Sequence, residues 1–362
     1  MPLPLAPTGS QGPHRRTSTP KTDAGAGQDE RGPQERRRIR VMGIVQGVGF
    51  RPFVYRRALA LGLVGWVRND RSGVLIDVEG PPRRLDRLER ALADEPPRLA
   101  NVTAVVVEAV GPPSGHERFR IAATDHAGPP TASVGIDTAT CARCLAEVAD
   151  PADRRYRYPF TNCTDCGPRY TIVRTVPYDR PATTMADFTM CAACQTEYDD
   201  PADRRFHAQP NACPACGPQL TWRSSEGTAV AVGDVALGHA VAALRDGRIV
   251  AVKGLGGYHL AVDATASDAV ADLRRRKHRD DKPFAVMVPD ETAAQAIADL
   301  DGAAMAALAS IGRPVVLAPV RTSADLAPGV ARGLVEVGVL LPYTPLHHLL
   351  LQGVGRPVVM TS

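Results

Sequence analysis

The sequence contains no apolar run close to the about 18 residues that a membrane-spanning helix requires. Its N-terminus also lacks the apolar h-region of a secretory signal peptide. We therefore expect no membrane span and a reducing, cytoplasmic location. The 362 residues, of which 44% are hydrophobic and 23% charged, are enough for two or three globular domains.

Most of the chain also lacks net charge, although the formal total is +4. Residues 1–40 hold eight of the 43 Lys and Arg but only four of the 39 Asp and Glu, so the remainder is neutral. A neutral body argues against a general nucleic-acid-binding surface, because such affinity rests on basic side chains. Segment 1–38 is rich in Pro, Gly and Ser, which predicts a disordered basic tail. It is either solvated or a basic interaction arm.

No cysteine stands outside a Cys-x-x-Cys pair, since all eight fall in four such pairs. In a reducing compartment these pairs bind metal more often than they form disulfides. They belong to an internal repeat, in which C-x2-C-x18-C-x2-C-G-P occurs twice with an offset of 50 residues, and DPADRR recurs at the same place in each copy. Two copies of one small module, within 135–222, are the natural interpretation.

Each module offers four thiolates, the tetrahedral ligand set that Zn²⁺ prefers. Because sulfur takes all four positions, we predict two structural zinc ions and no redox role. Pairing across the two repeats is an alternative that the spacing leaves open. His207, near the second module, is interpreted as a packing or surface histidine and not as a ligand. The predicted zinc ligands are Cys141, Cys144, Cys163 and Cys166 for one ion, and Cys191, Cys194, Cys213 and Cys216 for the other.

Segment 39–124 has the pattern of a compact domain with strands and helices. Period-two alternation predicts the strands, and a proline opens each predicted helix. The order β-α-β-β-α-β is the ferredoxin-like pattern. The predicted strands are 39–45, 64–68, 74–79, 102–110 and 119–122, and the predicted helices are 52–61 and 82–93.

The first strand-to-helix corner of this domain reads QGVGFRP (46–52). Gly47 and Gly49 permit positive φ angles and a close approach, and N–H groups at the start of a helix attract anions. Arg51 adds a planar fork that matches two phosphate or carboxylate oxygens. The corner therefore predicts a small-anion site. The alternative is a glycine-rich turn with an exposed arginine, and a dinucleotide fingerprint fits poorly because its third glycine is missing.

Two stretches around this corner, GIVQGVGFRPFVYRRA (43–58) and GWVRNDRSGVLIDVEG (65–80), resemble the acylphosphatase signature. The resemblance implies that a loop and an arginine hold the phosphate of an acyl phosphate, and that an asparagine orients the attacking water. By motif, these catalytic roles fall on Arg51 and Asn69. The implied phosphate-binding residues are Gln46, Gly47, Val48, Gly49, Phe50 and Arg51.

Segment 230–362 has the pattern of an α/β domain. A glycine loop at 254–257 follows one predicted strand, and a Thr-Ser pair ends the chain beyond another. Open α/β sheets bind ligands at such places, which favours a site over a merely solvated run of cations. The cations in question are Arg274, Arg275, Arg276, Lys277, Arg279 and Lys282. The predicted helices are 235–245 and 266–277, and the predicted strands are 249–253, 284–288, 315–320 and 358–360.

This region resembles the YrdC family, whose members bind ATP and make carbamoyl-type adenylates, and some of which bind double-stranded RNA. The resemblance implies ATP with Mg²⁺ as co-substrate. The chain ends before the asparagine of that family's Thr-Ser-x-Asn motif and directly after a strand, so we expect a C-terminally truncated domain. The implied nucleotide-binding residues are Lys277, Arg279, Lys282, Thr361 and Ser362.

The three parts in this order are similar to the HypF family of [NiFe]-hydrogenase maturation carbamoyltransferases. The long stretches RRYRYPFTNCTDCGPRYTIVRTVPYDRPATTMADF (154–188) and DRRFHAQPNACPACGP (203–218) carry the resemblance. It implies an α+β multidomain protein with a ferredoxin-like acylphosphatase domain, two small zinc modules of four cysteines each and a truncated YrdC-like α/β domain.

The family resemblance also implies a reaction sequence. Carbamoyl phosphate is split at the first domain, the carbamate reacts with ATP to give carbamoyl adenylate, and the group passes to the C-terminal cysteine of a HypE-like acceptor protein. Because the expected last domain is missing, we expect this chain to keep mainly the acyl phosphate hydrolysis. The alternatives are a zinc-stabilised module that binds double-stranded RNA through the basic cluster, and a plain acylphosphatase with appended domains.

Overall fold

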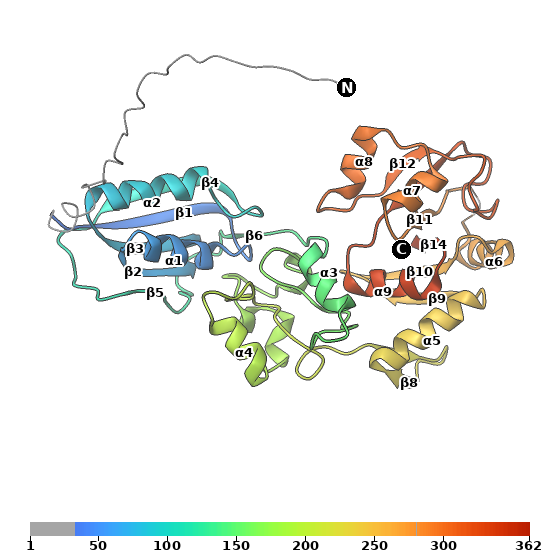
Figure 1. The fold of residues 1–362 in the computed structure, drawn as a ribbon, viewed down its shortest axis with the longest axis horizontal. Helices are drawn as coiled ribbons and strands as arrows, with labels where there is room; N and C mark the ends of the chain where they lie inside the picture. Colours follow the sequence, from blue (N-terminus) through green and yellow to red (C-terminus); the bar gives the residue numbers. More distant parts are fainter. Residues whose placement is uncertain (1–32, 280) are drawn as a thin grey trace, which may run out of the picture.

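The computed structural model describes residues 33–362 apart from Asp280. Three parts follow one another along the long axis of the molecule, a first sheet, a middle part with little regular structure, and a second sheet (Figure 1). Most of the predicted tail lies outside the described residues. Its predicted end at residue 38 is wrong, because strand β1 (Glu35–Gln46) already begins at Glu35. Arg36 and Arg38 are held in that strand by hydrogen bonds to Asp77, at 2.8 and 3.1 Å.

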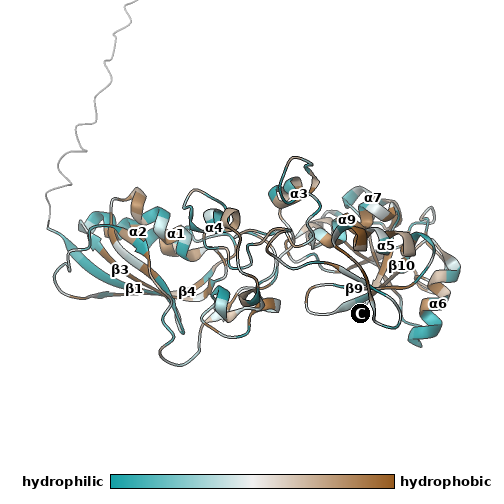
Figure 2. Ribbon diagram, turned by 90° about the horizontal axis from the view of Figure 1, so that it is seen from below, coloured by the Kyte–Doolittle hydropathy of each residue, from teal (hydrophilic) through white to brown (hydrophobic). Residues whose placement is uncertain are grey.

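The first part has the predicted ferredoxin-like topology. Its sheet has the order β4-β1-β3-β2-β5, with β1 antiparallel to both β3 and β4. Helices α1 and α2 lie on the same face of this sheet (Figure 2). The other elements are α1 (Phe50–Ala60), β2 (Val64–Asp70), β3 (Gly73–Gly80), α2 (Pro82–Asp94), β4 (Asn101–Ala109), β5 (Phe119–Ile121) and a short β6 (Ser133–Val134) parallel to β1.

The core of the first part follows from its sequence periodicity. Leu85, Leu88 and Leu92 recur on one face of α2 and are fully buried against the sheet. Ile39 and Val41 alternate inward from β1 in the same way. This packing fixes the corner between β1 and α1, where the predicted anion site lies.

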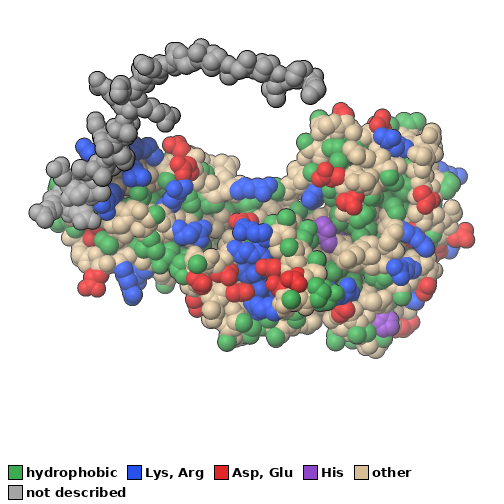
Figure 3. All heavy atoms as spheres, viewed as in Figure 1, with side chains coloured by type: hydrophobic (Ala, Val, Ile, Leu, Met, Phe, Trp, Pro, Cys, Tyr) green, Lys and Arg blue, Asp and Glu red, His purple; other side chains and the backbone are tan. Residues whose placement is uncertain are grey.

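The middle part is built from the two cysteine modules and has two short helices, α3 (Ala142–Ala149) and α4 (Ala192–Asp199), which the sequence analysis did not predict. Each helix begins directly after the first cysteine of its module. Three 3-10 helices connect the modules, at Tyr170–Ile172, Arg180–Ala182 and Thr184–Asp187. Acidic and basic side chains gather over this middle part (Figure 3). Its core around the cysteines is small.

The C-terminal part contains a sheet with the order β12-β13-β11-β14-β10-β9, in which β11 and β13 are parallel and the other pairs antiparallel. The predicted glycine loop, Gly254 to Gly257, is the turn of the β9–β10 hairpin, closed by a 2.8 Å hydrogen bond from Gly254 N to Gly257 O. The predicted strands and helices of this part are present, and β10, β13 and α7–α9 are additional. The strands are β9 (Val250–Lys253), β10 (Tyr258–Asp263), β11 (Ala285–Met287), β12 (Val316–Pro319), β13 (Glu336–Leu340) and β14 (Val358–Thr361).

Helices pack around this second sheet, and a short hairpin precedes them. The hairpin consists of β7 (Thr221–Arg223) and β8 (Ala229–Val232). The helices are α5 (Gly233–Arg245), α6 (Ser267–Lys277), α7 (Glu291–Ile297), α8 (Gly302–Ala309) and α9 (Pro345–Val354). Among the described residues, no helix combines the length and the apolar character needed to cross a membrane.

Candidate functional site

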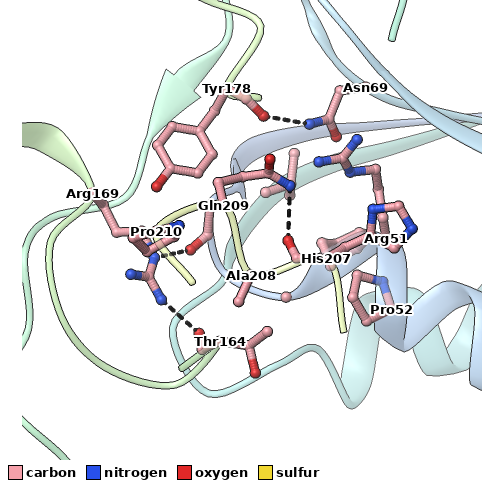
Figure 4. Close-up of a pocket in the computed structure, with 14 residues that line it drawn as sticks. Arg51, Pro52, Asn69, Thr164, Arg169, Tyr178, His207, Ala208, Gln209 and Pro210 are labelled. Atoms are coloured by element: carbon pink, nitrogen blue, oxygen red, sulfur yellow. Dashed lines mark hydrogen bonds between the residues drawn. The ribbon is translucent and has the colours of Figure 1, made fainter. Parts of the chain in front are cut away.

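The β1–α1 corner forms one side of a pocket (Figure 4). Gly47 and Gly49 both have φ near +74°, a left-handed conformation that glycine adopts without a Cβ clash. Helix α1 begins at Phe50, two residues earlier than predicted, so Pro52 is its third residue. The first N–H groups of a helix have no acceptor within the helix, so Pro52 removes no helical hydrogen bond there. The N–H groups of Phe50 and Arg51 belong to this turn, whose partial positive charge favours an anion.

Gly47 is required by packing as well as by its backbone angle. A Cβ at this position would lie 3.2 Å from the Arg169 Cδ and 3.2 Å from the Tyr178 Cε1. Both neighbours belong to the middle part of the chain. The glycine therefore allows the middle part to approach the corner closely.

Arg51 lies in this pocket with only 8% of its side chain exposed. Its guanidinium is 3.4 Å from the Asp179 Oδ1 and 3.4 Å from the Thr124 Oγ1, and the Thr124 hydroxyl donates to Asp179 at 2.7 Å. These contacts of Arg51 are long for hydrogen bonds. The cation is thus held at the pocket by weak contacts that an oxyanion can replace.

Asn69, at the end of β2, is 1% exposed and is oriented by the middle part. Its Nδ2 donates to the Tyr178 carbonyl at 3.0 Å, and no described residue hydrogen-bonds its buried Oδ1. The fixed amide leaves an acceptor oxygen without a protein partner beside Arg51. Such an acceptor can take a hydrogen bond from a water molecule.

The predicted phosphate-binding residues divide into two groups. Gly47, Gly49, Phe50 and Arg51 line the pocket, together with Asn69. Gln46 does not offer its side chain, because its amide already bonds the carbonyls of Asp70 and Gly73 and the N–H of Tyr178, each at 2.7 Å. The Val48 side chain is packed in the core.

The opposite side of the pocket consists of residues from the zinc modules, which the sequence analysis missed. They are Thr164, Arg169, Tyr178, His207, Ala208, Gln209 and Pro210. Arg169 is 2% exposed and joins the two sides, because its Nη2 donates to the carbonyls of Cys163 and Thr164 at 2.8 and 2.9 Å while its Nε donates to the Gly47 carbonyl. The first cysteine cluster is therefore linked directly to the loop at 46–51, which we call the phosphate loop because of its predicted role.

A difference between the two repeats could have pointed to one of these residues. His207 and Arg157 occupy equivalent positions, 50 residues apart, and both adopt a left-handed φ of 55°. Arg157 donates to Asp234 of α5 at 2.7 Å, whereas His207 lines the pocket. The two repeats therefore carry different residues at this position because His207 faces the pocket and Arg157 faces the C-terminal part.

The eight cysteines form two tetrahedral clusters, each within a single repeat. Neighbouring sulfurs are 3.5 to 3.8 Å apart in the first cluster and 3.6 to 3.7 Å apart in the second. Four sulfurs at the usual Zn–S distance of about 2.3 Å would be about 3.8 Å apart. The donor sets therefore fit two structural zinc ions, and the alternative of pairing across the repeats is wrong. The ligands are Cys141, Cys144, Cys163 and Cys166, and Cys191, Cys194, Cys213 and Cys216.

Each module supplies arginines to the cysteine cluster of the other. Arg204 donates to the Cys144 Sγ at 3.1 Å, and Arg154 donates to the Cys194 Sγ at 3.4 Å. A cluster of four thiolates and Zn²⁺ carries two negative charges, so these guanidinium groups are its counter-charges. Each of these arginines also pairs with a carboxylate. Burial opposes ionisation of Glu197, but hydrogen bonds from Arg155 and Arg154 outweigh it and lower the pKa of Glu197 to about 2.

The predicted nucleotide-binding residues are brought together only in part. The Lys277 ammonium donates to the Ser362 carbonyl, and Thr361 pairs with Leu260, close to the β9–β10 turn. Lys277, the chain end and the glycine turn thus lie near one edge of the sheet. Arg279 bonds the carbonyls of Lys282 and Pro283 within its own loop, and the Lys282 side chain is exposed.

Much of the basic cluster is engaged in internal contacts. Arg274 is buried and donates to the Gly329 carbonyl at 2.6 Å, and its guanidinium lies over the Phe284 ring. Arg275 and Arg276 both pair with Asp272. Arg274 is therefore withdrawn from the surface, and Asp272 offsets part of the charge of Arg275 and Arg276, which weakens the interpretation as an RNA-binding face.

A second cavity, of about 300 Å³, lies between the zinc modules and the C-terminal part. The hairpin turn at Lys253 to Gly256 forms one side, and Phe160 and Met185 of the middle part form another. The Thr140 N–H donates to the Tyr343 carbonyl at 3.2 Å, which ties the two parts together beside the cavity.

Comparison with known families assigns each part. Residues 37–121 match the acylphosphatase family, and residues 140–173 and 190–223 each match the HypF finger. Residues 242–362 match the Sua5, YciO and YrdC family, which is described as telomere recombination. The predicted acylphosphatase, zinc-module and YrdC resemblances are thereby confirmed.

Full-length relatives share this order of parts. The chain is 52% identical over 323 residues to carbamoyltransferase HypF2 of Cupriavidus necator, covering 88% of this chain and 40% of that protein. It is 54% identical over 325 residues to carbamoyltransferase HypF of Rhodobacter capsulatus, covering 90% and 42%. It superposes with a TM-score of 0.84 and 42% identity on a crystal structure of full-length HypF in the phosphate- and nucleotide-bound form, covering 91% of this chain and 43% of that one.

The chain spans about two-fifths of the length of these relatives. Within that span, about half of the residues are identical to those of the two carbamoyltransferases. The family matches along the chain and the superposition on full-length HypF agree with this identity. The chain belongs to the HypF carbamoyltransferase family.

Proposed function

We propose that this chain carries the carbamoyl-phosphate-splitting step of a hydrogenase-maturation carbamoyltransferase. The observation that carries the proposal is the pocket in which Arg51 and the left-handed loop at Gly47 and Gly49 lie beside Asn69. A full-length HypF has been crystallised in a phosphate- and nucleotide-bound form, which supports phosphate as a ligand for a chain of this kind.

In this proposal the phosphoryl group binds between the loop N–H groups and the Arg51 guanidinium. Arg51 would neutralise charge that develops on the phosphoryl oxygens as the bond to the acyl oxygen breaks. The Asn69 Oδ1 would accept a hydrogen bond from the attacking water and aim its oxygen at phosphorus, and the water's protons would leave with the phosphate product or pass to solvent. Water adds to phosphorus, the phosphorus–acyl oxygen bond breaks, and inorganic phosphate and carbamate are released.

The later steps are proposals for the whole enzyme. Carbamate would react with ATP and Mg²⁺ at the sheet edge near Lys277, Thr361 and Ser362, with Arg279 and Lys282 as further cations, and the carbamoyl group would pass to the C-terminal cysteine of a HypE-like acceptor. Carbamate is unstable in water, so close packing of the parts would limit its loss. Eight paired cysteines support a cytoplasmic location, where zinc binding is favoured over disulfides.

Release of inorganic phosphate from carbamoyl phosphate tests the proposal. Arg51→Ala should lower kcat/KM at least about a hundredfold, because the phosphoryl group loses its main counter-charge. Asn69→Ala should lower kcat by about a hundredfold and leave the affinity for inorganic phosphate nearly unchanged, because it removes the water-orienting acceptor while the loop and Arg51 remain.

Arg56→Ala is the matched control, since Arg56 lies on the same helix α1 and does not line the pocket. It should retain wild-type activity. Full activity in Arg51→Ala, or no phosphate release by the wild-type chain, would refute the proposal.

A further inference from the structure

The wall of the pocket opposite the phosphate loop belongs to the zinc modules, and a ligand held by its phosphate would direct its other end at that wall or toward solvent. His207 lies on this wall, close to Arg51 (Figure 4). The wall is therefore the place where the acyl group of a substrate can be recognised.

His207 is held firmly in position. Its N–H donates to the Tyr198 carbonyl at 2.9 Å, and its carbonyl accepts from the Gln209 Nε2 at 2.8 Å. Its ring packs between those of Tyr198 and Phe206, with centroids 4.8 and 4.7 Å away. The left-handed φ of 55° costs about 1 kcal/mol or more for a residue with a Cβ. Strain of this kind is retained where the surrounding structure fixes a side chain.

The His207 ring also has unused hydrogen-bonding capacity. Its Nδ1 is buried and has no partner among the described residues. Burial, together with the positive charge of Arg51, lowers the pKa of His207 to about 4. The ring is therefore neutral near pH 7 and offers one N–H donor and one bare nitrogen acceptor.

The neighbouring polar groups on the wall do not provide this acceptor. The Gln209 amide is fully engaged, since its Oε1 accepts from the Arg180 N–H at 2.7 Å and its Nε2 bonds His207. The guanidinium of Arg169 is a donor only. The Tyr178 hydroxyl has no partner among the described residues and can also accept, but it points toward Arg169 and away from Arg51 (Figure 4).

We propose that His207 is a specificity-determining residue, which accepts a hydrogen bond from the NH₂ of a carbamoyl group and so favours carbamoyl phosphate over acetyl phosphate. The inference rests on the proposed function of the pocket and adds the means of substrate selection. Acetyl phosphate has a methyl group where carbamoyl phosphate has its NH₂, so it cannot make this bond and would leave the acceptor unpaired. The second zinc module would thereby complete the active site of the first part.

The test compares kcat/KM for carbamoyl phosphate and acetyl phosphate, measured as phosphate release by the whole chain. His207→Gly removes the ring and tolerates the left-handed backbone. It should lower kcat/KM for carbamoyl phosphate about tenfold, the loss of roughly one hydrogen bond, and change that for acetyl phosphate less than about threefold.

The matched control is Arg157→Gly, at the equivalent position of the first module with the same φ and away from the pocket. It should leave the ratio of the two kcat/KM values at the wild-type level. If His207→Gly does not fold, His207→Asn also tolerates the left-handed conformation but has a shorter side chain, and it should lower the ratio in the same way.

Two results would overturn the inference, an unchanged ratio in the His207 variants or an equal loss for both substrates. Different results would show that the proposed function itself is wrong. In that case the wild-type chain would release no phosphate from either substrate, or Arg51→Ala would match the wild type.

Discussion

At the scale of single residues, buried histidines make the stability of the C-terminal part depend on pH. His347 is completely buried in α9, and neither ring nitrogen has a partner among the described residues. Burial lowers the pKa of His347 to about 3, and burial also lowers that of His348 to about 4. Both rings are therefore neutral in the folded protein near pH 7.

We expect the C-terminal part to lose stability on acidification at a pH where its carboxylates are still ionised. Below the ordinary histidine pKa of about 6.5 the unfolded chain binds protons that the folded chain does not, so the free energy of unfolding falls as the pH drops from about 6.5 toward 4. Each histidine can contribute up to about 1.4 kcal/mol per pH unit. Urea unfolding at pH 7.5 and 5.5 measures the loss, with zinc content checked at each pH.

His347→Leu is the informative variant for this pH dependence. It should reduce the loss of stability between the two pH values, because one of the two proton-binding groups is gone. An identical loss in the variant and the wild type would show that the buried ring does not cause the effect.

The two residues proposed to perform the chemistry could be predicted from the sequence, whereas the residues that hold them in place could not. Arg51 and Asn69 follow from a local motif around one corner. Their partners Asp179 and Tyr178 are separated from them by more than a hundred residues. No local pattern reports such a contact, and the interpretation of His207 as a packing residue was incomplete for the same reason.

At the scale of elements, the two zinc modules stabilise each other through exchanged arginines. Arg204 belongs to the second module but bonds Cys144 and Glu147 of the first. Arg154 belongs to the first module but contacts Cys194 and Glu197 of the second. Each module thus depends on its neighbour for the counter-charge of its metal site.

We therefore expect Arg204→Met to weaken the first zinc site, although the residue lies in the second module. Loss of a charge-assisted hydrogen bond should speed zinc release from that site about tenfold. A chelator that reports free zinc would show one of two zinc ions leaving faster. Arg143→Met, which removes a surface ion pair with Asp165, should leave both rates unchanged. Equal rates of zinc release from both sites in Arg204→Met would contradict the inference that each module depends on an arginine of the other.

Elements with a clear hydrophobic periodicity could be predicted better than elements that depend on a metal ion for stability. All seven predicted elements of the first part are present, with ends shifted by a few residues. Helices α3 and α4 escaped prediction because they are only eight residues long and follow a zinc ligand, so much of their stability comes from the cluster. Strand β1 extends beyond its prediction because Asp77 neutralises the arginines at its start.

At the scale of the whole molecule, the zinc modules connect the pocket at the β1–α1 corner to the second sheet. Arg169 and Tyr178 bind the phosphate loop and Asn69, and Thr140 binds Tyr343 of the C-terminal part. The order of the three parts could be predicted from motifs, but the pocket wall that the zinc modules contribute could not. This wall depends on contacts between separate parts, and no sequence pattern in either part indicates that they touch.

Zinc removal should therefore impair a reaction that occurs outside the zinc sites. Stripping both ions should lower kcat/KM for carbamoyl phosphate at least about tenfold, because the modules would unfold and release Asn69 and the loop. Added zinc should restore the activity of a refolded sample. Unchanged kcat/KM in a verified zinc-free chain would show that the first part works alone.

The proposed function depends above all on whether the corner at Gly47 to Arg51 binds a phosphoryl group between its N–H groups and the Arg51 guanidinium. A crystal structure of the chain with inorganic phosphate would decide this. We expect phosphate density in the pocket, in contact with the loop N–H groups and the guanidinium, with Asn69 still bonded to Tyr178. An empty pocket with the guanidinium turned toward solvent, at a phosphate concentration that saturates the protein, would contradict it.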